Sequence, residues 1–363
     1  MRFKNLSYKK NLKKSLLNKI SELFDSGAFI NGPKINLLEN KLASLTKRKY
    51  AVAVGSGTAA LILSLRVLNL KKGDEVIVPC MSWISTANAV VLNNLKPVFA
   101  DIGNDLNISI ESVEKLINKN VKAILYVNFG GRMADIQKLN QLSKKYRIPL
   151  IEDGSQSFGA KYNKIINGEN GVLSAISLNP MKILNSIGEA GVILTNNKKY
   201  YLQLKKLRTS GVNSKGICIQ PSENAKMDTI QAISLIENLK HYKSKILIRR
   251  KNAQYIKNKL SDILDFLDLP ELIKKDSFYI LVALHPKRNK IIDIAKKYKI
   301  ELKIHHYPLM PDMPFYKKAN FRKDVDFGKK ISKKIFSIPF YEEYKKRDLD
   351  YVISILRRII INL

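Results

Sequence analysis

Residues 148–160, IPLIEDGSQSFGA, join an apolar strand to an acidic end and a run of small residues. The apolar part has the length of a buried strand, and Asp153 stands at its carboxyl end. Ligands bind at the carboxyl ends of strands in open α/β sheets, so Asp153 is placed to meet one. A carboxylate there can pair with a pyridinium nitrogen and keep it protonated. Capping of the next helix is the other role open to Asp153.

Segments of the same kind lie on both sides of this stretch. Short runs rich in Val and Ile predict further strands at 51–57, 74–80, 96–102, 122–129 and 174–179. Segments with helical periodicity lie between them, at 58–68, 85–93, 109–118 and 135–146. This alternation predicts an α/β fold with a mostly parallel central sheet.

The pattern changes after residue 194. A glycine-free stretch, 226–264, predicts a long helix that links two lobes. The remainder holds a strand-like run at 278–286, a helix around 291–300, a loop at 305–316, and helices from Val325 and Asp348. We therefore expect a large α/β domain over residues 1–245 and a smaller α+β domain over residues 246–363.

The composition is strongly basic. The chain has 363 residues, with 64 Lys and Arg against 31 Asp and Glu, and a formal net charge of +33. Only 13 of the basic residues are arginine, and the charge is spread along the chain. A nucleic-acid-binding surface would gather its charge in a stripe with interleaved aromatic residues. The composition therefore favours lysine-rich solvated surfaces, and we expect no nucleic-acid partner.

The other general features favour a cytoplasmic protein. Cys80 and Cys218 are too far apart in sequence to establish a disulfide and have no metal-ligand spacing, so no metal site is expected. The basic N-terminus lacks the apolar core of a secretory signal and predicts an amphipathic helix. The most apolar long window, 75–92, is interrupted by Ser, Thr and Asn, so no membrane segment is expected.

Three more segments end strands of the predicted sheet. In VGSGTAAL (54–61), small residues lead into a helix whose free N–H groups offer an anion site, although an ordinary turn fits as well. In SLNPMK (177–182), Lys182 follows a strand among apolar residues, where desolvation frees the amine as a nucleophile. Trp83, the single tryptophan, follows a third strand and can stack on a flat cofactor or pack in the core. A phosphate cradle, a stacking ring, a pyridinium partner and a lysine are the parts of a pyridoxal 5′-phosphate site.

Eight segments in register carry a family resemblance from about Ser26 to the C-terminus. They are Gly32-Pro33 with Glu39, SGTAAL (56–61), GDEVIVP (73–79), PVFADI (97–102), IEDGSQSFGAKYNKIING (151–168), the Lys182 segment, NAKMDTIQA (224–232) and HHYP (305–308). With them the chain resembles the sugar aminotransferases of the DegT/DnrJ/EryC1/StrS group. The resemblance implies the fold of a fold type I pyridoxal-phosphate aminotransferase, with a large domain around the sheet and a smaller C-terminal α+β domain.

The resemblance also implies roles for matching residues. Lys182 would hold the cofactor as an internal aldimine and then move protons, and Asp153 would pair with the pyridine nitrogen. Gln156 would lie against the ring near its phenolic oxygen, and Trp83 would stack on the ring face. The implied phosphate-binding residues are Gly57, Thr58, Ala59 and Ser177.

Other implied contacts involve a second subunit and the substrate. Asn224 occupies the place of an asparagine that completes the neighbouring subunit's phosphate site, which implies an obligate homodimer with shared active sites. Lys226 and Tyr307 are the implied substrate contacts. Lys226 stands where arginine is common, so a point charge replaces a bidentate fork.

Some positions depart from the family pattern. Asn128 replaces a histidine, and Leu178 to Met181 replace a more aromatic run. The segment Gly188-Glu189-Ala190-Gly191 resembles the subgroup that acts on 3-keto sugars more than the 4-keto subgroup.

The implied activity is transfer of an amino group from an amino acid, with glutamate expected, to a keto sugar. A nucleotide-linked keto-deoxy sugar is the expected acceptor, in amino-sugar biosynthesis for surface polysaccharide or a related glycoconjugate. One alternative on the same fold is a sugar 3-dehydratase, which carries His where this chain has Lys182. Another is a non-enzymatic regulatory relative, which predicts a degraded cofactor site. The sequence leaves open the sugar, the aminated carbon, the nucleotide carrier and the amino donor.

Overall fold

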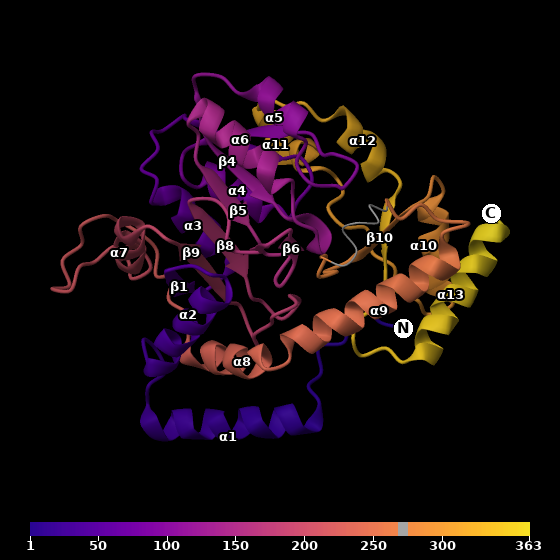
Figure 1. The fold of residues 1–363 in the computed structure, drawn as a ribbon, viewed down its shortest axis with the longest axis horizontal. Helices are drawn as coiled ribbons and strands as arrows, with labels where there is room; N and C mark the ends of the chain where they lie inside the picture. Colours follow the sequence, from indigo (N-terminus) through magenta and orange to yellow (C-terminus); the bar gives the residue numbers. More distant parts are fainter. Residues whose placement is uncertain (268–274) are drawn as a thin grey trace.

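The computed structural model describes residues 1–267 and 275–363 of the chain. Its centre is a seven-stranded sheet in the order β1-β9-β8-β5-β4-β2-β3 (Figure 1). The strands are β1 (Tyr50–Val54), β2 (Glu75–Pro79), β3 (Lys96–Ala100), β4 (Val121–Val127), β5 (Leu150–Asp153), β8 (Leu173–Ser177) and β9 (Gly191–Thr195). Strands β3, β2, β4, β5 and β8 run parallel, so the prediction of a mostly parallel sheet is confirmed.

Strand β9 lies outside the predicted strands. It runs antiparallel to both of its neighbours, β1 and β8. Its apolar run, Val192–Leu194, is too short to show a period, so the sequence pattern did not separate it from the loop before it. A small two-stranded sheet of β6 (Lys161–Tyr162) and β7 (Ile165–Ile166) lies outside the central sheet.

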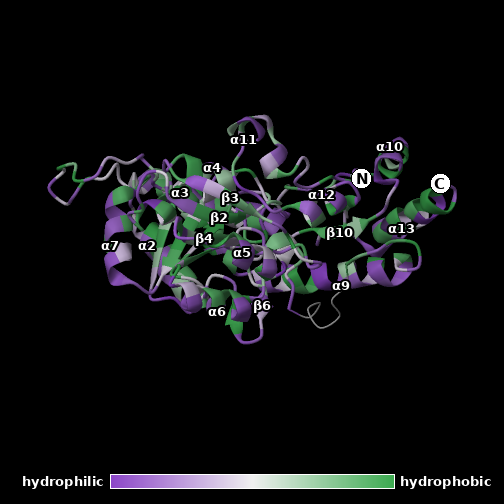
Figure 2. Cartoon of the chain, turned by 90° about the horizontal axis from the view of Figure 1, so that it is seen from above, coloured by the Kyte–Doolittle hydropathy of each residue, from purple (hydrophilic) through white to green (hydrophobic). Residues whose placement is uncertain are grey.

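Helices cover both faces of the sheet. One face packs against α3 (Gly57–Arg66), α4 (Ser85–Val91) and α7 (Lys198–Leu207). The other face packs against α2 (Pro33–Leu45), α5 (Ile110–Leu116), α6 (Ile136–Tyr146) and α8 (Thr229–Leu239). Successive strand residues serve opposite faces, as Val76 and Ile77 do in β2. Figure 2 shows the result, with hydrophobic residues concentrated on the strands and hydrophilic ones on the outer helices.

The C-terminal lobe contains a smaller sheet and several helices. Its antiparallel strands are β10 (Leu281–Leu284) and β11 (Ile335–Ile338), and its helices are α10 (Arg288–Lys297), α11 (Pro314–Ala319), α12 (Asp326–Ser332) and α13 (Lys346–Ile361). Short 3₁₀ turns occur at Phe129–Gly131 and Met310–Asp312. Strand β11 was not predicted, and the predicted loop 305–316 contains the start of α11.

The linking helix is broken into two. Helix α8 ends at Leu239 and α9 (Tyr242–Leu260) begins after a turn at Lys240 and His241, so the predicted continuous helix 226–264 is wrong. The turn lets α8 cover the sheet while α9 runs to the C-terminal lobe (Figure 1). Residue 245, the predicted domain boundary, falls in the first turn of α9. The division into residues 1–245 and 246–363 stays a prediction.

The N-terminal segment contacts both lobes. Helix α1 (Lys10–Ser26) buries Leu16 and Leu23 against Ile233 of α8, as an amphipathic helix does. The amphipathic helix was predicted over residues 1–23, and residues 1–9 are not helical. The residues before it lie against the C-terminal lobe, where Glu301 N donates to Met1 O at 3.0 Å. No helix within residues 1–267 or 275–363 is both long and apolar enough to cross a membrane.

Candidate active site

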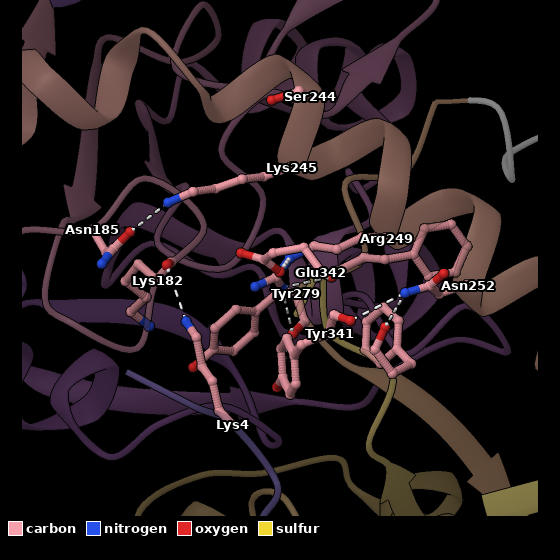
Figure 3. Close-up of polar contacts among 12 residues, drawn as sticks. Lys4, Lys182, Asn185, Ser244, Lys245, Arg249, Asn252, Tyr279, Tyr341 and Glu342 are labelled. Carbon is pink, nitrogen blue, oxygen red and sulfur yellow. Dashed lines mark hydrogen bonds and ion pairs between the residues drawn. The ribbon is translucent and has the colours of Figure 1, made fainter. Parts of the chain in front are cut away.

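Lys182 lies in a closed loop between β8 and β9. The N–H of Ser186 donates to Leu178 O at 2.8 Å, and the N–H of Lys182 donates to Asn179 O at 3.0 Å. The side chain of Lys182 is partly buried, and its Nζ lies 4.8 Å from the ring centroid of Tyr279 (Figure 3). The C-terminal lobe therefore supplies an aromatic ring directly beneath the amine.

Asp153 is the last residue of β5 and is 5% exposed. Its Oδ2 accepts from Thr86 Oγ1 at 3.2 Å, and its Oδ1 accepts from the N–H of Ser155 at 3.1 Å. Thr86 belongs to α4, and its hydroxyl also lies 3.0 Å from Ser82 Oγ. The carboxylate is thus held at the carboxyl end of a central strand, as expected, by partners from two different strand ends.

The neighbouring acid, Glu152, faces the other side of the sheet. It accepts from Asn128 Nδ2 at 2.7 Å, from Asn167 Nδ2 at 3.0 Å and from the N–H of Gly168 at 3.1 Å. Burial raises the pKa of Glu152, and the N–H of Gly168 and the charge of Arg48 oppose that shift. Asn128, whose role the sequence left open, therefore supports the buried carboxylate of Glu152.

The N-terminus of α3 packs closely on the end of β8. Ser56 caps the helix, since its Oγ accepts from the N–H of Ala59 at 3.0 Å. A Cβ on Gly57 would stand 2.4 Å from Ser177 Cβ, a separation that side chains do not tolerate. Only glycine therefore allows the first turn of α3 to lie against Ser177, which brings the predicted phosphate-binding residues together.

Two serines that the sequence analysis did not single out join this cradle. Ser85 Oγ lies 2.8 Å from Thr58 Oγ1, and Ser155 Oγ accepts from the N–H of Ser177 at 2.9 Å. Both serines follow strand ends, in the same segments as Trp83 and Asp153. Their position after strands was the available signal. The Ser155 hydroxyl links the ends of the neighbouring strands β5 and β8, and the Ser85 hydroxyl links the first turns of α4 and α3.

Trp83 lies in the turn between β2 and α4 and is 64% exposed. Its carbonyl accepts from the N–H of Thr86 at 3.1 Å, which ties the turn to the residue that contacts Asp153. The core-packing alternative for Trp83 is therefore wrong. The exposed ring is open to a planar ligand, and its stacking role stays a prediction.

Gln156 connects the sheet to the C-terminal lobe. Its Oε1 accepts from the N–H of Gly130 at 2.9 Å, and its Nε2 lies 3.5 Å from His306 Nε2. Burial lowers the pKa of His305 to about 4 and that of His306 well below its usual value, and the charge of Lys182 acts in the same direction on both. Both imidazoles are therefore neutral at neutral pH. The sequence matched these histidines to the family but gave them no role.

Asn224 and Lys226 lie on a strand-like segment beside the end of β1. Lys226 bridges Val54 in antiparallel fashion, and Ala225 O accepts from the N–H of Gly55 at 2.8 Å. Asn224 is exposed, and its side chain has no hydrogen bond to residues 1–267 or 275–363. The predicted contact with a second subunit and the predicted substrate role of Lys226 stay predictions.

Tyr307 is 53% exposed. Its ring lies 4.8 Å from Cζ of Arg288, whose guanidinium donates to Ile335 O at 2.9 Å. The structure thus attaches Tyr307 to the C-terminal lobe, next to the half-buried pair His305–His306. Its predicted substrate role stays a prediction.

The predicted residues fall into two sets at the carboxyl ends of the strands. The charge of Lys182 lowers the pKa of His306, which approaches Gln156. Asp153 bonds to Thr86, beside the pair Ser85–Thr58. Helix N-termini, hydroxyls, a carboxylate and an amine therefore meet at the carboxyl ends of the parallel strands. This arrangement can bind a phosphate group and a protonated ring nitrogen while presenting a nucleophilic amine.

The chain is similar to known proteins along most of its length. The pleiotropic regulatory protein of Geobacillus stearothermophilus is 28% identical over 349 residues, which cover 94% of each chain. The UDP-2-acetamido-2-deoxy-3-oxo-D-glucuronate aminotransferase of Pseudomonas aeruginosa is 33% identical over 235 residues, 64% of this chain and 66% of that protein.

The fold itself has solved counterparts. The crystal structure of a DegT DnrJ EryC1 StrS aminotransferase from Brucella abortus matches with a TM-score of 0.94 at 24% identity, over 99% of both chains. The predicted aminotransferase fold is thereby confirmed. The profile of the DegT/DnrJ/EryC1/StrS aminotransferase family matches residues 10–357, so the chain belongs to that family.

Proposed function

We propose that the protein is a cytoplasmic, pyridoxal-phosphate-dependent aminotransferase that acts on a keto sugar. The amino donor is an amino acid, L-glutamate, and the acceptor is a nucleotide-linked keto-deoxy sugar. The product serves the synthesis of surface polysaccharide or a related glycoconjugate. The name of the Pseudomonas aeruginosa relative supports a nucleotide-linked acceptor with the keto group at carbon 3.

One observation carries the proposal. A lysine and a carboxylate follow adjacent parallel strands, β8 and β5, and the N-terminus of α3 packs against the end of β8. Asp153 is buried with only neutral hydrogen-bond donors, which leaves its charge available to a cationic ring nitrogen. These features fit a ring that carries a phosphate at one end and a basic nitrogen at the other.

The residues of this chain have distinct tasks in that site. Pyridoxal phosphate, when bound, supplies an aldehyde that condenses with amines and a ring that withdraws negative charge. Lys182 Nζ holds it covalently and, once released, takes the proton from the α-carbon of the amino donor. Asp153 keeps the ring nitrogen protonated, and the α3 N-terminus with Thr58 and Ser177 binds the phosphate.

The neighbouring histidines leave the amine of Lys182 without a competing cation. Because burial keeps His305 and His306 neutral, they neither repel the amine nor protonate its substrate. Gln156 occupies the space between His306 and Gly130, where its amide can donate to an oxygen on the ring. In this proposal Lys182 carries out the proton transfer, and the neutral histidines add no positive charge beside it.

The two alternatives on this fold fit the site less well. A sugar 3-dehydratase of this family would carry His at position 182, where this chain has lysine. One relative is named as a regulatory protein, but a purely regulatory role leaves the group of Lys182, Asp153 and the α3 N-terminus without a purpose.

The first test replaces the lysine. The Lys182→Ala variant should fold normally but lose the visible absorbance of the bound cofactor. Its transamination rate should fall by at least roughly 100- to 10,000-fold, the acceleration that acid–base catalysis supplies. Lys199→Ala, which removes an exposed lysine of α7, serves as the matched control. Transamination by the Lys182→Ala variant at the control's rate would disprove the proposed function.

The second test identifies the acceptor through the reverse reaction. The enzyme is incubated with 2-oxoglutarate and a panel of nucleotide-linked amino sugars, and glutamate formation is measured. Deamination of a 3-amino sugar is the expected result. If only 4-amino sugars, or only free sugar phosphates, are turned over, the proposed acceptor is wrong.

The shared homodimeric site can be tested by mixing variants. If Asn224 completes the partner's phosphate site, a mixture of Lys182→Ala and Asn224→Ala subunits should regain activity, since each mixed dimer then contains one intact site. Analytical ultracentrifugation checks that dimers form. Dimers that stay inactive after subunit exchange would assign Asn224 to the site of its own chain.

A further inference from the structure

The chain begins with an extended segment, residues 1–9, which we call the N-terminal arm. It starts on the C-terminal lobe and passes to α1 beneath α8 (Figure 1). Phe3 is its main anchor, because its ring is 1% exposed and its N–H donates to Glu301 Oε2 at 2.6 Å. Residues 5–7 are exposed, so the arm holds to the body of the protein mainly through its first four residues.

The side chain of Lys4 reaches backbone carbonyls of the loop between β8 and β9 that carries Lys182, which we call the lysine loop. Its Nζ donates to Met181 O at 2.6 Å and to Lys182 O at 3.3 Å, and it lies 3.5 Å from Pro180 O. Figure 3 shows Lys4 approaching the Lys182 backbone from the side of the arm. One amine thus contacts three consecutive carbonyls, the last of which belongs to Lys182 itself.

The carbonyls of residues 180–182 need a hydrogen-bond donor from outside their own turn. Residues 179–182 form a single turn closed by the N–H of Lys182, and the carbonyls at the end of a turn have no further N–H within it. Fixing the peptides on both sides of the Lys182 Cα also fixes the direction in which its side chain leaves the loop.

The arm is otherwise loosely supported near this point. A cavity of about 500 Å³ lies beside it, lined by arm residues and by Asn185, Asn238, Lys245 and Glu343 among others. Lys4 therefore contacts the lysine loop at the edge of a cavity rather than within a packed core. Loss of this side chain would leave space that neighbouring atoms do not fill.

A chain of contacts returns from Lys4 to the amine of Lys182. Lys4 Nζ lies 5.6 Å from the ring centroid of Tyr341, and Tyr341 Oη donates to Tyr279 O at 3.5 Å. Tyr279 in turn supplies the ring beneath Lys182 Nζ (Figure 3). Lys4 thus contacts the backbone of Lys182 directly, and it contacts the ring of Tyr341, whose hydroxyl bonds to the residue beneath the Lys182 amine.

We propose that Lys4 is a positioning residue: the N-terminal arm delivers its amine to the carbonyls of residues 180–182 and so fixes the direction of Lys182. This role rests on the proposed function of Lys182. Lys4 acts in this role through the loop carbonyls alone, and no contact between Lys4 and substrate is part of it.

The test compares Lys4→Met, which keeps the apolar length but removes the donor, with Lys4→Arg, which keeps a donor. Amide hydrogen exchange is measured on the full chain with and without pyridoxal phosphate. In Lys4→Met, residues 182–188 should exchange roughly 10-fold faster, the size of one lost hydrogen bond. The kcat should fall about tenfold with little change in KM, and Lys4→Arg should recover part of both effects.

Lys14→Met removes an exposed lysine of α1 and serves as the control. Equal loop exchange in Lys4→Met and the control would overturn the proposal. Faster exchange in β4 as well as in the loop would also overturn it, since that result indicates a general loss of stability. Exchange without cofactor requires no catalysis, so failure here is distinguishable from failure of the Lys182→Ala test.

Discussion

The candidate site has two halves that are assembled differently. The strand-end half contains residues that lie at strand ends or helix starts of the sheet: Gly57, Thr58, Trp83, Asp153, Gln156 and Ser177. The lobe-side half contains residues that the C-terminal lobe and the N-terminal arm bring to the lysine loop: Lys4, Tyr279, His305 and His306. Lys182 lies between the two.

The two halves differ in what places their residues at the site. A residue of the strand-end half is placed by the short turn after its own strand, and the sheet aligns these turns at one edge. A residue of the lobe-side half is placed by docking of distant segments, as with Lys4 and Lys182, which are 178 positions apart. Substitutions in the first half should therefore alter chemistry locally, whereas those in the second should also alter stability and loop order.

The largest expected effect compares two adjacent acids of β5. Asp153→Asn should lower kcat roughly 100- to 1000-fold, because an amide cannot neutralise a protonated ring nitrogen. Glu152→Gln should leave kcat nearly unchanged but lower the free energy of unfolding by about 1–3 kcal/mol, since one of its buried donors loses its acceptor. Steady-state kinetics and urea unfolding measure the two effects.

Equal loss of kcat in both variants would contradict the assignment of Asp153 as the ring partner. It would mean that both carboxylates maintain the structure of the strand end, so that the two faces of β5 would not differ in their effect on kcat.

The second prediction concerns the lobe-side half. Arg249 is fully buried, pairs with Glu342 at 2.6 Å and donates to Phe278 O at 3.1 Å. Arg249→Met should lower the free energy of unfolding by about 3–5 kcal/mol, because it leaves a buried carboxylate unpaired. The neighbouring Arg250→Met, at a partly buried position, should cost much less. Thermal unfolding of both variants checks the difference.

Arg249 also supports the segment that carries Tyr279. Faster hydrogen exchange at Tyr279 in Arg249→Met, but not in Arg250→Met, would sharpen the distinction between the halves. Similar stability of the two variants would show that docking of the lobe does not depend on this ion pair.

The third prediction tests the close approach in the strand-end half. Gly57→Ala should weaken retention of pyridoxal phosphate and cost about 1–3 kcal/mol of stability, because the new Cβ would stand 2.4 Å from Ser177 Cβ. Ser177→Gly in the same chain should restore part of the stability by removing the opposing atoms. Cofactor retention is measured by visible absorbance after gel filtration. A double variant no more stable than Gly57→Ala would contradict the steric explanation.

The smallest expected effect is a pH dependence. Burial lowers the pKa of Lys4 to about 7; Arg249 and Lys245 lower it further, while Glu342 and Glu343 raise it. The folded protein thus favours the neutral amine, whereas the unfolded chain binds the proton. Between about pH 7 and pH 9 the unfolded state holds more protons, so this contribution to stability rises with pH. The difference in Tm between wild type and Lys4→Met should therefore grow by a few degrees as pH rises.

A constant or shrinking difference in Tm over this range would show that the buried amine of Lys4 does not set the pH response. Lys14→Met again provides the comparison, since its Tm should follow that of the wild type at every pH.

Much of the sheet and of the strand-end half could be predicted from the sequence. Val- and Ile-rich runs identified six of the seven sheet strands, and the small residues at 55–57 predicted an anion site before the next helix. The family resemblance, rather than the pattern, pointed to Ser177. Strand β9 escaped because its apolar residues carry no period. Ser85 and Ser155 escaped because a serine after a strand is common, and only the packed edge shows which ones face each other.

The sequence by itself determined the local structures, the polar residues at strand ends and the family, because neighbouring residues encode hydrophobic period, capping and turns. Tertiary structure alone decided the break between α8 and α9, the neutral histidines beside Lys182, and the contact of Lys4 with the lysine loop. Those features depend on which distant segments exclude water together, and burial of Phe3 and Arg249 is a property of the whole fold.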